Sequence, residues 1–154
     1  MSDGGNSSDP TVLVVDDAPD IRLLMREVLR LHGFGVTEAE DGGDALAVLA
    51  AGDLPAVIVL DVQMPGVDGW STLAALRADP RTVAVPVVLC TVRSHPKDQL
   101  RAWELGCDAF LAKPFRIDDL VHHVRDLAHA DAPARAANRQ RHLALARSEA
   151  AAVS

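Results

Sequence analysis

Five short apolar runs alternate along the chain with longer segments in which apolar residues recur every three or four positions. The runs cover residues 11–15, 34–39, 56–60, 85–90 and 108–112. Short apolar runs bounded by turn residues favour strands, and uninterrupted ones are typical of parallel strands that are covered on both faces. The run at 34–39 alternates only weakly, which predicts a less buried strand.

The segments between the runs predict amphipathic helices. In the first, 18–31, the residues Ile21, Leu24 and Val28 lie on one face of a helix. Helices are expected in the corresponding places after the other runs, beginning within 41–44 and ending before Gly52, then over 69–78, 96–105 and 117–127. Five β–α units with short connections predict an α/β fold, a doubly wound parallel sheet with right-handed crossovers.

The two ends of the chain differ from this pattern. Residues 1–9 are rich in Gly, Ser and Asn and are expected to be disordered. We assign residues 10–130 to one folded domain and 131–154 to an Ala/Arg-rich tail that is either helical or disordered. Its larger apolar residues, Leu143, Leu145 and Val153, are badly spaced for a helix face, so the tail is not expected to pack.

Composition and charge narrow the class of protein. The 154 residues carry a net charge of −7, which argues against nucleic acid as the main partner. The polar start lacks a signal peptide, and no apolar stretch approaches the ~20 residues needed to cross a bilayer. Cys90 and Cys107 form no C-x-x-C motif, which favours a protein of the cytoplasm without a structural disulfide.

Polar residues follow four of the predicted strands. Asp16 and Asp17 follow the first run, Asp61 the third, Thr91 the fourth and Lys113 the fifth. The carboxyl ends of parallel strands meet at one edge of the sheet, and the first and third strands are neighbours at the switch point of a doubly wound sheet. Adjacent carboxylates repel and need a cation, and Mg²⁺ prefers oxygen ligands.

Each of these residues also has an ordinary interpretation. Asp16 and Asp17 taken alone fit a helix cap with an extra acid about as well as a metal site. Asp61 fits a loop aspartate, Thr91 a β-branched strand residue, and Lys113 a surface lysine before a turn. The convergence of three carboxylates is what favours a metal and a phosphoryl group over these alternatives.

Four segments resemble the receiver domains of response regulators. They are Val-Val-Asp-Asp-Ala-Pro-Asp at 14–20, Leu-Asp-Val-Gln-Met-Pro-Gly-Val-Asp-Gly at 60–69, Cys-Thr at 90–91 and Phe-Leu-Ala-Lys-Pro-Phe at 110–115. The resemblance extends over about 11–127 and its motifs occur in order at matching intervals. It implies a flavodoxin-like (βα)5 fold with strand order 2-1-3-4-5.

The resemblance also implies roles for the acidic residues. Asp61 would accept a phosphoryl group from a sensor histidine kinase or a histidine phosphotransfer protein. Asp17, Asp61 and the backbone carbonyl of Gln63 would bind Mg²⁺, and Asp16 would act mainly through a metal-bound water.

The basic and hydroxyl residues take complementary roles in the family. Thr91 and Lys113 would hold the phosphoryl oxygens, in keeping with phosphoryl transfer by positioning and charge neutralisation. Thr91 and Phe110 would form the switch that remodels a protein-binding face at 96–127. The simpler alternative for Phe110 is a core aromatic that stays buried in both states.

Some positions depart from the usual family pattern. Val92 stands where many members have alanine, and a bulkier side chain there would narrow access to the phosphoryl group. Phe110 replaces the common tyrosine and has no hydroxyl group. Gln63 and Arg93 flank the site and are expected to tune the lifetime of the phosphoryl group.

These features predict a single-domain response regulator that catalyses only its own phosphorylation and dephosphorylation. Too few residues follow Leu127 for an output domain, so we expect signalling through a downstream protein, without DNA or membrane binding, from a monomer or a phosphorylation-dependent dimer. A phosphorylation-independent docking module is the alternative. An aspartate-based phosphohydrolase is disfavoured because Ala18 breaks the Asp-x-Asp motif, and no Gly-rich turn supports dinucleotide binding.

Overall fold

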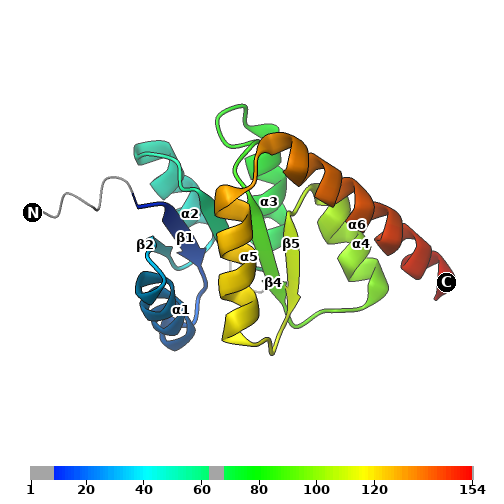
Figure 1. Cartoon of the computed structure of the whole chain (residues 1–154), viewed down its shortest axis with the longest axis horizontal. Coiled ribbons are helices and arrows are strands. Elements are labelled where there is room, and N and C mark those ends of the chain that lie inside the picture. Colours follow the sequence, from blue (N-terminus) through cyan, green and yellow to red (C-terminus); the bar gives the residue numbers. More distant parts are fainter. Residues whose placement is uncertain (1–8, 63–67, 154) are drawn as a thin grey trace, which may run out of the picture.

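The computed structural model describes residues 9–62 and 68–153, in which five strands form one parallel sheet in the order β2-β1-β3-β4-β5 (Figure 1). The predicted α/β architecture and strand order are confirmed. The strands are β1 (Thr11–Val15), β2 (Gly35–Ala39), β3 (Val57–Asp61), β4 (Val87–Thr91) and β5 (Ala109–Ala112). The helices are α1 (Pro19–Leu31), α2 (Gly42–Ala51), α3 (Gly69–Ala78), α4 (Pro96–Leu105), α5 (Ile117–His129) and α6 (Ala132–Ala152).

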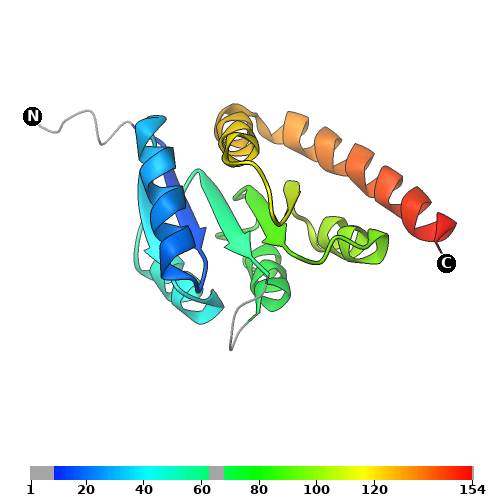
Figure 2. The ribbon, with the colours of Figure 1, turned by 90° about the horizontal axis from the view of Figure 1, so that it is seen from below.

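Helices cover both faces of the sheet, which explains the uninterrupted apolar runs (Figure 2). Successive residues of β1, such as Val12 and Leu13, point to opposite faces of the sheet and pack into two separate cores. The core under α1 and α5 includes Met25 and Leu120, whereas Leu73 belongs to the core under α2, α3 and α4.

The ends of some strands differ by one or two residues from the sequence prediction. β4 begins at Val87 rather than at residue 85, because Pro86 has no N–H to donate to a neighbouring strand. β5 begins after Asp108, whose carboxylate accepts the N–H of Val87 at 2.9 Å. β3 extends to Asp61, so that residue is itself the last of its strand.

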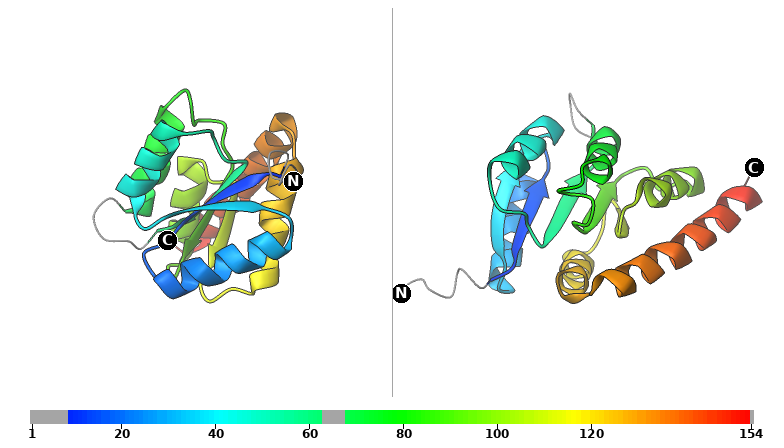
Figure 3. Two further views of the ribbon diagram at one scale, coloured as in Figure 1. Left: turned by 90° about the vertical axis from the view of Figure 1, so that its left-hand side faces the viewer. Right: turned by 90° about the horizontal axis from the view of Figure 1, so that it is seen from above.

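The Ala/Arg-rich tail forms one long helix, α6, which packs against α4 (Figure 3). The expectation that the tail has no packing face was wrong, because the buried residues of α6 are alanines rather than its larger apolar residues. Ala146 and Ala150 are about 5–6% exposed. Leu145 and Val153 remain exposed, as their poor spacing indicated. Within the described residues, no helix is both long and apolar enough to cross a membrane.

Candidate functional site

Three carboxylates meet at the carboxyl ends of β1 and β3. Val15 and Leu60 are partners in the register of these strands, so Asp16 and Asp61 follow side by side. One carboxylate oxygen from each of Asp16, Asp17 and Asp61 lies within 4.8 Å of the others. The convergence predicted from the sequence is therefore present in the fold.

The three carboxylates differ in exposure. Asp16 and Asp61 are 1% and 3% exposed, whereas Asp17 is exposed. The side chain of Asp16 accepts the backbone N–H of Ala18 at 2.9 Å, and its carbonyl accepts from Arg22 at 2.6 Å. The pair of buried acids thus sits at the base of the site, with the third at its mouth.

Lys113 supplies the positive charge that two buried carboxylates require. Its Nζ lies 3.3 Å from Asp61 Oδ1 and 3.4 Å from Asp16 Oδ2. Burial alone lowers the pKa of Lys113, but the charges of Asp61 and Asp16 outweigh that effect and raise it. The Lys113–Pro114 peptide bond is cis. Lys113 is therefore a charged partner of the acidic cluster rather than the surface lysine of the alternative interpretation.

Thr91 ends β4 beside the acidic cluster. It directly follows Cys90, the register partner of Asp61, and its side chain is fully buried. Its hydroxyl oxygen accepts the backbone N–H of Arg93 at 2.9 Å, and its carbonyl accepts from Lys113 N at 2.7 Å. Burial raises the pKa of the Cys90 thiol to about 12, so that neighbour stays protonated.

Gly69, at the start of α3, is a site-shaping residue that the sequence reasoning missed. A Cβ at this position would lie 2.5 Å from Val62 Cα and 2.6 Å from the carbonyl oxygen of Asp61. Only glycine lets α3 approach the backbone of Asp61 this closely. Its place at the end of the 60–69 motif was the available signal.

The oxygen donors suit a hard divalent cation such as Mg²⁺. Mg²⁺ prefers carboxylate and water oxygens and keeps several waters, and the exposed Asp17 leaves room for them. Three carboxylates with one nearby ammonium also leave negative charge that a cation would neutralise. Gln63, the fourth expected ligand, lies outside the described residues.

Phe110 is a residue of β5 and faces a pocket lined by residues of α4, α5 and α6. It is partly buried and lines a cavity of about 430 Å³ together with Trp103, His123 and His142. Phe110 also packs against the core that contains Trp103, and its role as a switch residue stays a prediction. Its neighbours belong to the predicted 96–127 face and to α6.

A second hollow, of about 450 Å³, adjoins the site on its apolar side. Ile21 and Leu24 of α1 are 41% and 52% exposed there, and Val92 is 56% exposed. The lining residues are Ile21, Leu24, Met25, Val92, Lys113, Pro114, Phe115 and Ile117. An apolar rim thus runs from α1 to the side chain that neutralises Asp61.

Comparisons with known proteins agree on one family. The sequence profile of the response regulator receiver domain matches residues 12–125. The regulator RpaA of Synechocystis, described as a DNA-binding dual master transcriptional regulator, is 38% identical over 120 residues, which are 77% of this chain and 48% of RpaA. The transcriptional regulatory protein PrrA of Mycobacterium tuberculosis is 43% identical over 118 residues, 77% of this chain and 49% of PrrA. The chain thus spans about half the length of these relatives.

Solved structures give the same result. The receiver domain of the Francisella response regulator 1452 superposes with a TM-score of 0.73 at 32% identity, covering 78% of this chain and 97% of that one. The response regulator TrrA of Thermotoga maritima, solved in complex with Mg²⁺-BeF, has a TM-score of 0.68 at 32% identity, covering 77% of this chain and 98% of TrrA.

Proposed function

The chain belongs to the response regulator receiver family, and on that premise we propose that it accepts a phosphoryl group on Asp61 in a Mg²⁺-dependent reaction. The donor is the phosphohistidine of a sensor histidine kinase or of a histidine phosphotransfer protein. The observation that carries the proposal is the convergence of Asp16, Asp17 and Asp61 at one sheet edge with Lys113 against the two buried acids.

Each site residue has a separate role in the phosphoryl transfer. A carboxylate oxygen of Asp61 attacks phosphorus, the new O–P bond forms, and the N–P bond breaks with its electron pair returning to the donor imidazole. Lys113, released from Asp61, neutralises a phosphoryl oxygen. The hydroxyl of Thr91 donates a hydrogen bond to another phosphoryl oxygen while it still accepts the backbone N–H of Arg93. Positioning and charge neutralisation of this kind account for most of the catalysis of phosphoryl transfer.

The carboxylates would hold the metal. Asp17 and Asp61 would bind Mg²⁺ directly, together with the carbonyl of Gln63, and Asp16 would act through a metal-bound water. When bound, Mg²⁺ offsets the charge that gathers on the phosphoryl oxygens. The protein thus catalyses its own phosphorylation and dephosphorylation and no reaction of another substrate.

The apolar rim of the site fits the approach of a donor protein. Ile21, Leu24 and Val92 are large, exposed and next to Lys113, in a hollow lined almost entirely by apolar side chains. A helix that carries the phosphohistidine and an apolar flank would bury this rim while its imidazole reaches Asp61. Cys90 and Cys107 are both buried and form no disulfide, which suits a donor and acceptor in the reducing cytoplasm.

The test is phosphoryl incorporation measured by intact mass. The wild-type chain and Asp61→Asn are incubated with a small phosphodonor, or with a phosphorylated kinase, with Mg²⁺ and with a chelator. We expect the wild type to gain one phosphoryl group when the donor and Mg²⁺ are both present, and none when the chelator is added. An equal adduct on Asp61→Asn would contradict the proposal. The absence of any adduct on a folded wild type with both donors would favour a phosphorylation-independent docking module.

A further inference from the structure

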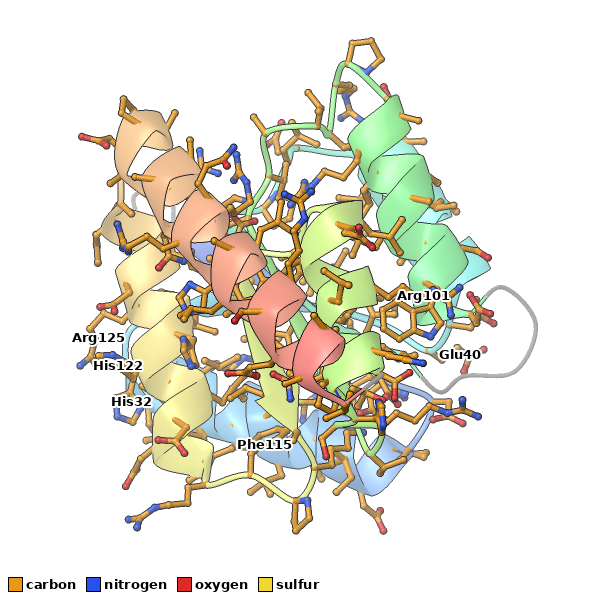
Figure 4. The ribbon with its side chains drawn as sticks, turned by 90° about the vertical axis from the view of Figure 1, so that its right-hand side faces the viewer. His32, Glu40, Arg101, Phe115, His122 and Arg125 are labelled. Carbon is orange, nitrogen blue, oxygen red and sulfur yellow. The ribbon has the colours of Figure 1, made fainter. Side chains whose placement is uncertain are left out.

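Helix α6 lies across the 96–127 face, through which the family resemblance implies that the chain signals. It starts beside α5, passes in front of the edge strand β5 and packs along α4 (Figure 4). The 96–127 face, formed by α4, β5 and α5, is therefore covered in part by a segment of the same chain. The 12–125 region that matches the receiver family ends before α6 begins.

Specific polar contacts hold the first half of α6. Arg139 Nη1 lies 2.7 Å from the buried carboxylate of Asp108, directly before β5. Asn138 donates to the carbonyl of Asp108 at 3.3 Å, and Arg135 donates to the carbonyl of Ala84 at 2.8 Å. These contacts fix the register of α6 on the face.

A stacked ring pair and buried alanines hold the second half of α6. The ring of His142 stacks on Trp103 of α4, with centroids 4.5 Å apart and planes inclined by 17°. Ala146 and Ala150 are buried, and Ala146 joins the core that contains Trp103. Together with Arg139 and the partly buried Leu143, these alanines follow a spacing of four, three and four residues on one face of the helix.

Several features limit the stability of this docking. The fully buried side chains of α6 are alanines, which remove little apolar area from water. Within the described residues, the Nε atom of Arg135 is buried without a hydrogen-bond partner, which opposes docking. The cavity of about 430 Å³ between α6 and α4, β5 and α5 shows that the fit is incomplete. A change in the underlying face would therefore weaken the docking further.

Phe110 connects the face to the acidic site. It lines the cavity beneath α6 and lies three residues before Lys113 on the short strand β5. Thr91 pairs with Ala112 of the same strand, so any movement of Thr91 or Lys113 toward a phosphoryl group acts on β5. A change in the position of Phe110 would alter the surface against which α6 rests.

We propose that α6 is an internal occupant of a helix-binding face, and that phosphoryl transfer to Asp61 displaces it so that a partner helix binds there. This inference rests on the proposed function. The partner would present the same features as α6. It would be a helix with small apolar residues at the same spacing and a basic residue that reaches Asp108. The unmodified chain keeps its signalling face closed with its own C-terminal helix.

The first test is hydrogen exchange of the full-length chain, read by mass spectrometry for peptides within 132–152. In the unmodified wild type, we expect the amides of α6 to be protected. After reaction with phosphodonor and Mg²⁺, protection of α6 should fall at least tenfold, and Asp61→Asn should keep it. Intact mass of the same sample shows whether the adduct formed. An adduct with unchanged α6 protection overturns the displacement alone. No adduct, either with the small phosphodonor or with a phosphorylated kinase, overturns the proposed function and the displacement with it.

The second test uses a matched pair of substitutions on α6. Ala146→Glu places a carboxylate at a buried position, and Ala144→Glu makes the same change at an exposed one. We expect Ala146→Glu to lose α6 protection without any phosphodonor, and to bind a labelled synthetic peptide of residues 131–152. Ala144→Glu and the unmodified wild type should not bind it. Retained protection of α6 in Ala146→Glu, or its loss without peptide binding, would overturn the proposal.

Discussion

At the scale of single residues, Lys113 balances the charge of the site. Its ammonium lies within 3.4 Å of both Asp16 and Asp61, and its side chain is 25% exposed. The two carboxylates raise its pKa despite partial burial, so the ammonium stays charged at neutral pH. Phosphoryl transfer and metal binding both alter the negative charge that this lysine faces.

Replacing Lys113 by alanine should destabilise the metal-free chain by roughly 1–3 kcal/mol, because two buried carboxylates lose their cationic partner. Mg²⁺ should recover most of that loss by neutralising the same oxygens. Urea unfolding with and without Mg²⁺ measures both effects.

Lys97→Ala is the matched control, since Lys97 is an exposed lysine in the first turn of α4. Its unfolding should stay within about 0.5 kcal/mol of wild type with and without Mg²⁺. A Lys113→Ala chain as stable as Lys97→Ala without metal would show that the acidic cluster is not strained in the absence of its lysine.

The acidic and basic residues of the site were predictable from sequence because each follows an apolar run that the fold places at one edge. Gly69 was not, since its role depends on the distance between α3 and the backbone of Asp61. Arg22 was also missed. It caps the carbonyl of Asp16 from one turn inside α1, and no local pattern distinguishes it from other helix arginines.

At the scale of elements, α1 and β2 are joined by a cluster of charges around Glu38. Arg26 and Arg22 of α1 lie 2.8 and 3.1 Å from its two carboxylate oxygens. Burial raises the pKa of Glu38, but hydrogen bonds and the positive charges of Arg26 and Arg22 lower it by more. The net shift of the pKa is therefore downward from 4.5. The weakly apolar strand β2 is thus fixed to its neighbouring helix by ion pairs.

The lowered pKa of Glu38 sets a direction for pH dependence. The unfolded chain binds the proton more tightly, so Glu38 contributes stability above pH 4.5 that is lost as the pH falls through its folded pKa. Glu38→Gln should cost roughly 0.5–1 kcal/mol at pH 7, since the group is partly exposed. Urea midpoints of the two proteins should converge as the pH falls below 4.5.

Glu104→Gln serves as the control because Glu104 is exposed on α4. Its difference from wild type should stay small at every pH. A Glu38→Gln deficit that persists unchanged at pH 3.5 would mean that its ion pairs are not the source.

The elements themselves were largely predictable. The helices at 69–78 and 96–105 match the structure, and the strand ends differ by one or two residues. Those differences arise from single hydrogen bonds, such as the one between Asp108 and Val87, that sequence periodicity does not contain.

At the scale of the whole molecule, Asp108 connects distant parts of the chain. Its carboxylate is almost fully buried and lies 2.9 Å from Arg77 of α3 and 2.7 Å from Arg139 of α6. The guanidinium of Arg77 also donates to the carbonyls of Gly106 and Val85. The carboxylate of Asp108 therefore connects α3, α6 and the N-terminal ends of β4 and β5 in one charged centre.

Asp108→Asn should destabilise the protein by roughly 3 kcal/mol, because it leaves Arg77 buried without its counter-charge. Asp118→Asn, at a side chain that is 80% exposed, should change stability little. Urea unfolding at neutral pH compares the two. Equal stability of both variants would contradict a structural role for this centre.

The position of α6 was beyond sequence reasoning for a physical reason. Ala146 and Ala150 are buried whereas Ala144 is exposed, and an alanine-rich helix gives no hydrophobic period to tell them apart. The docking is decided by partners elsewhere in the chain, Asp108 and Trp103. Only the assembled face shows which side of the helix it binds.

The central claim is that Asp61 itself carries the phosphoryl group. The most direct measurement is to phosphorylate the chain with Mg²⁺, reduce it with borohydride, which converts an aspartyl phosphate to homoserine, and locate homoserine by peptide mass spectrometry. We predict homoserine at position 61 alone, and none without phosphodonor. Homoserine at Asp16 or Asp17, or a phosphorylated chain with none at 61, would contradict the account.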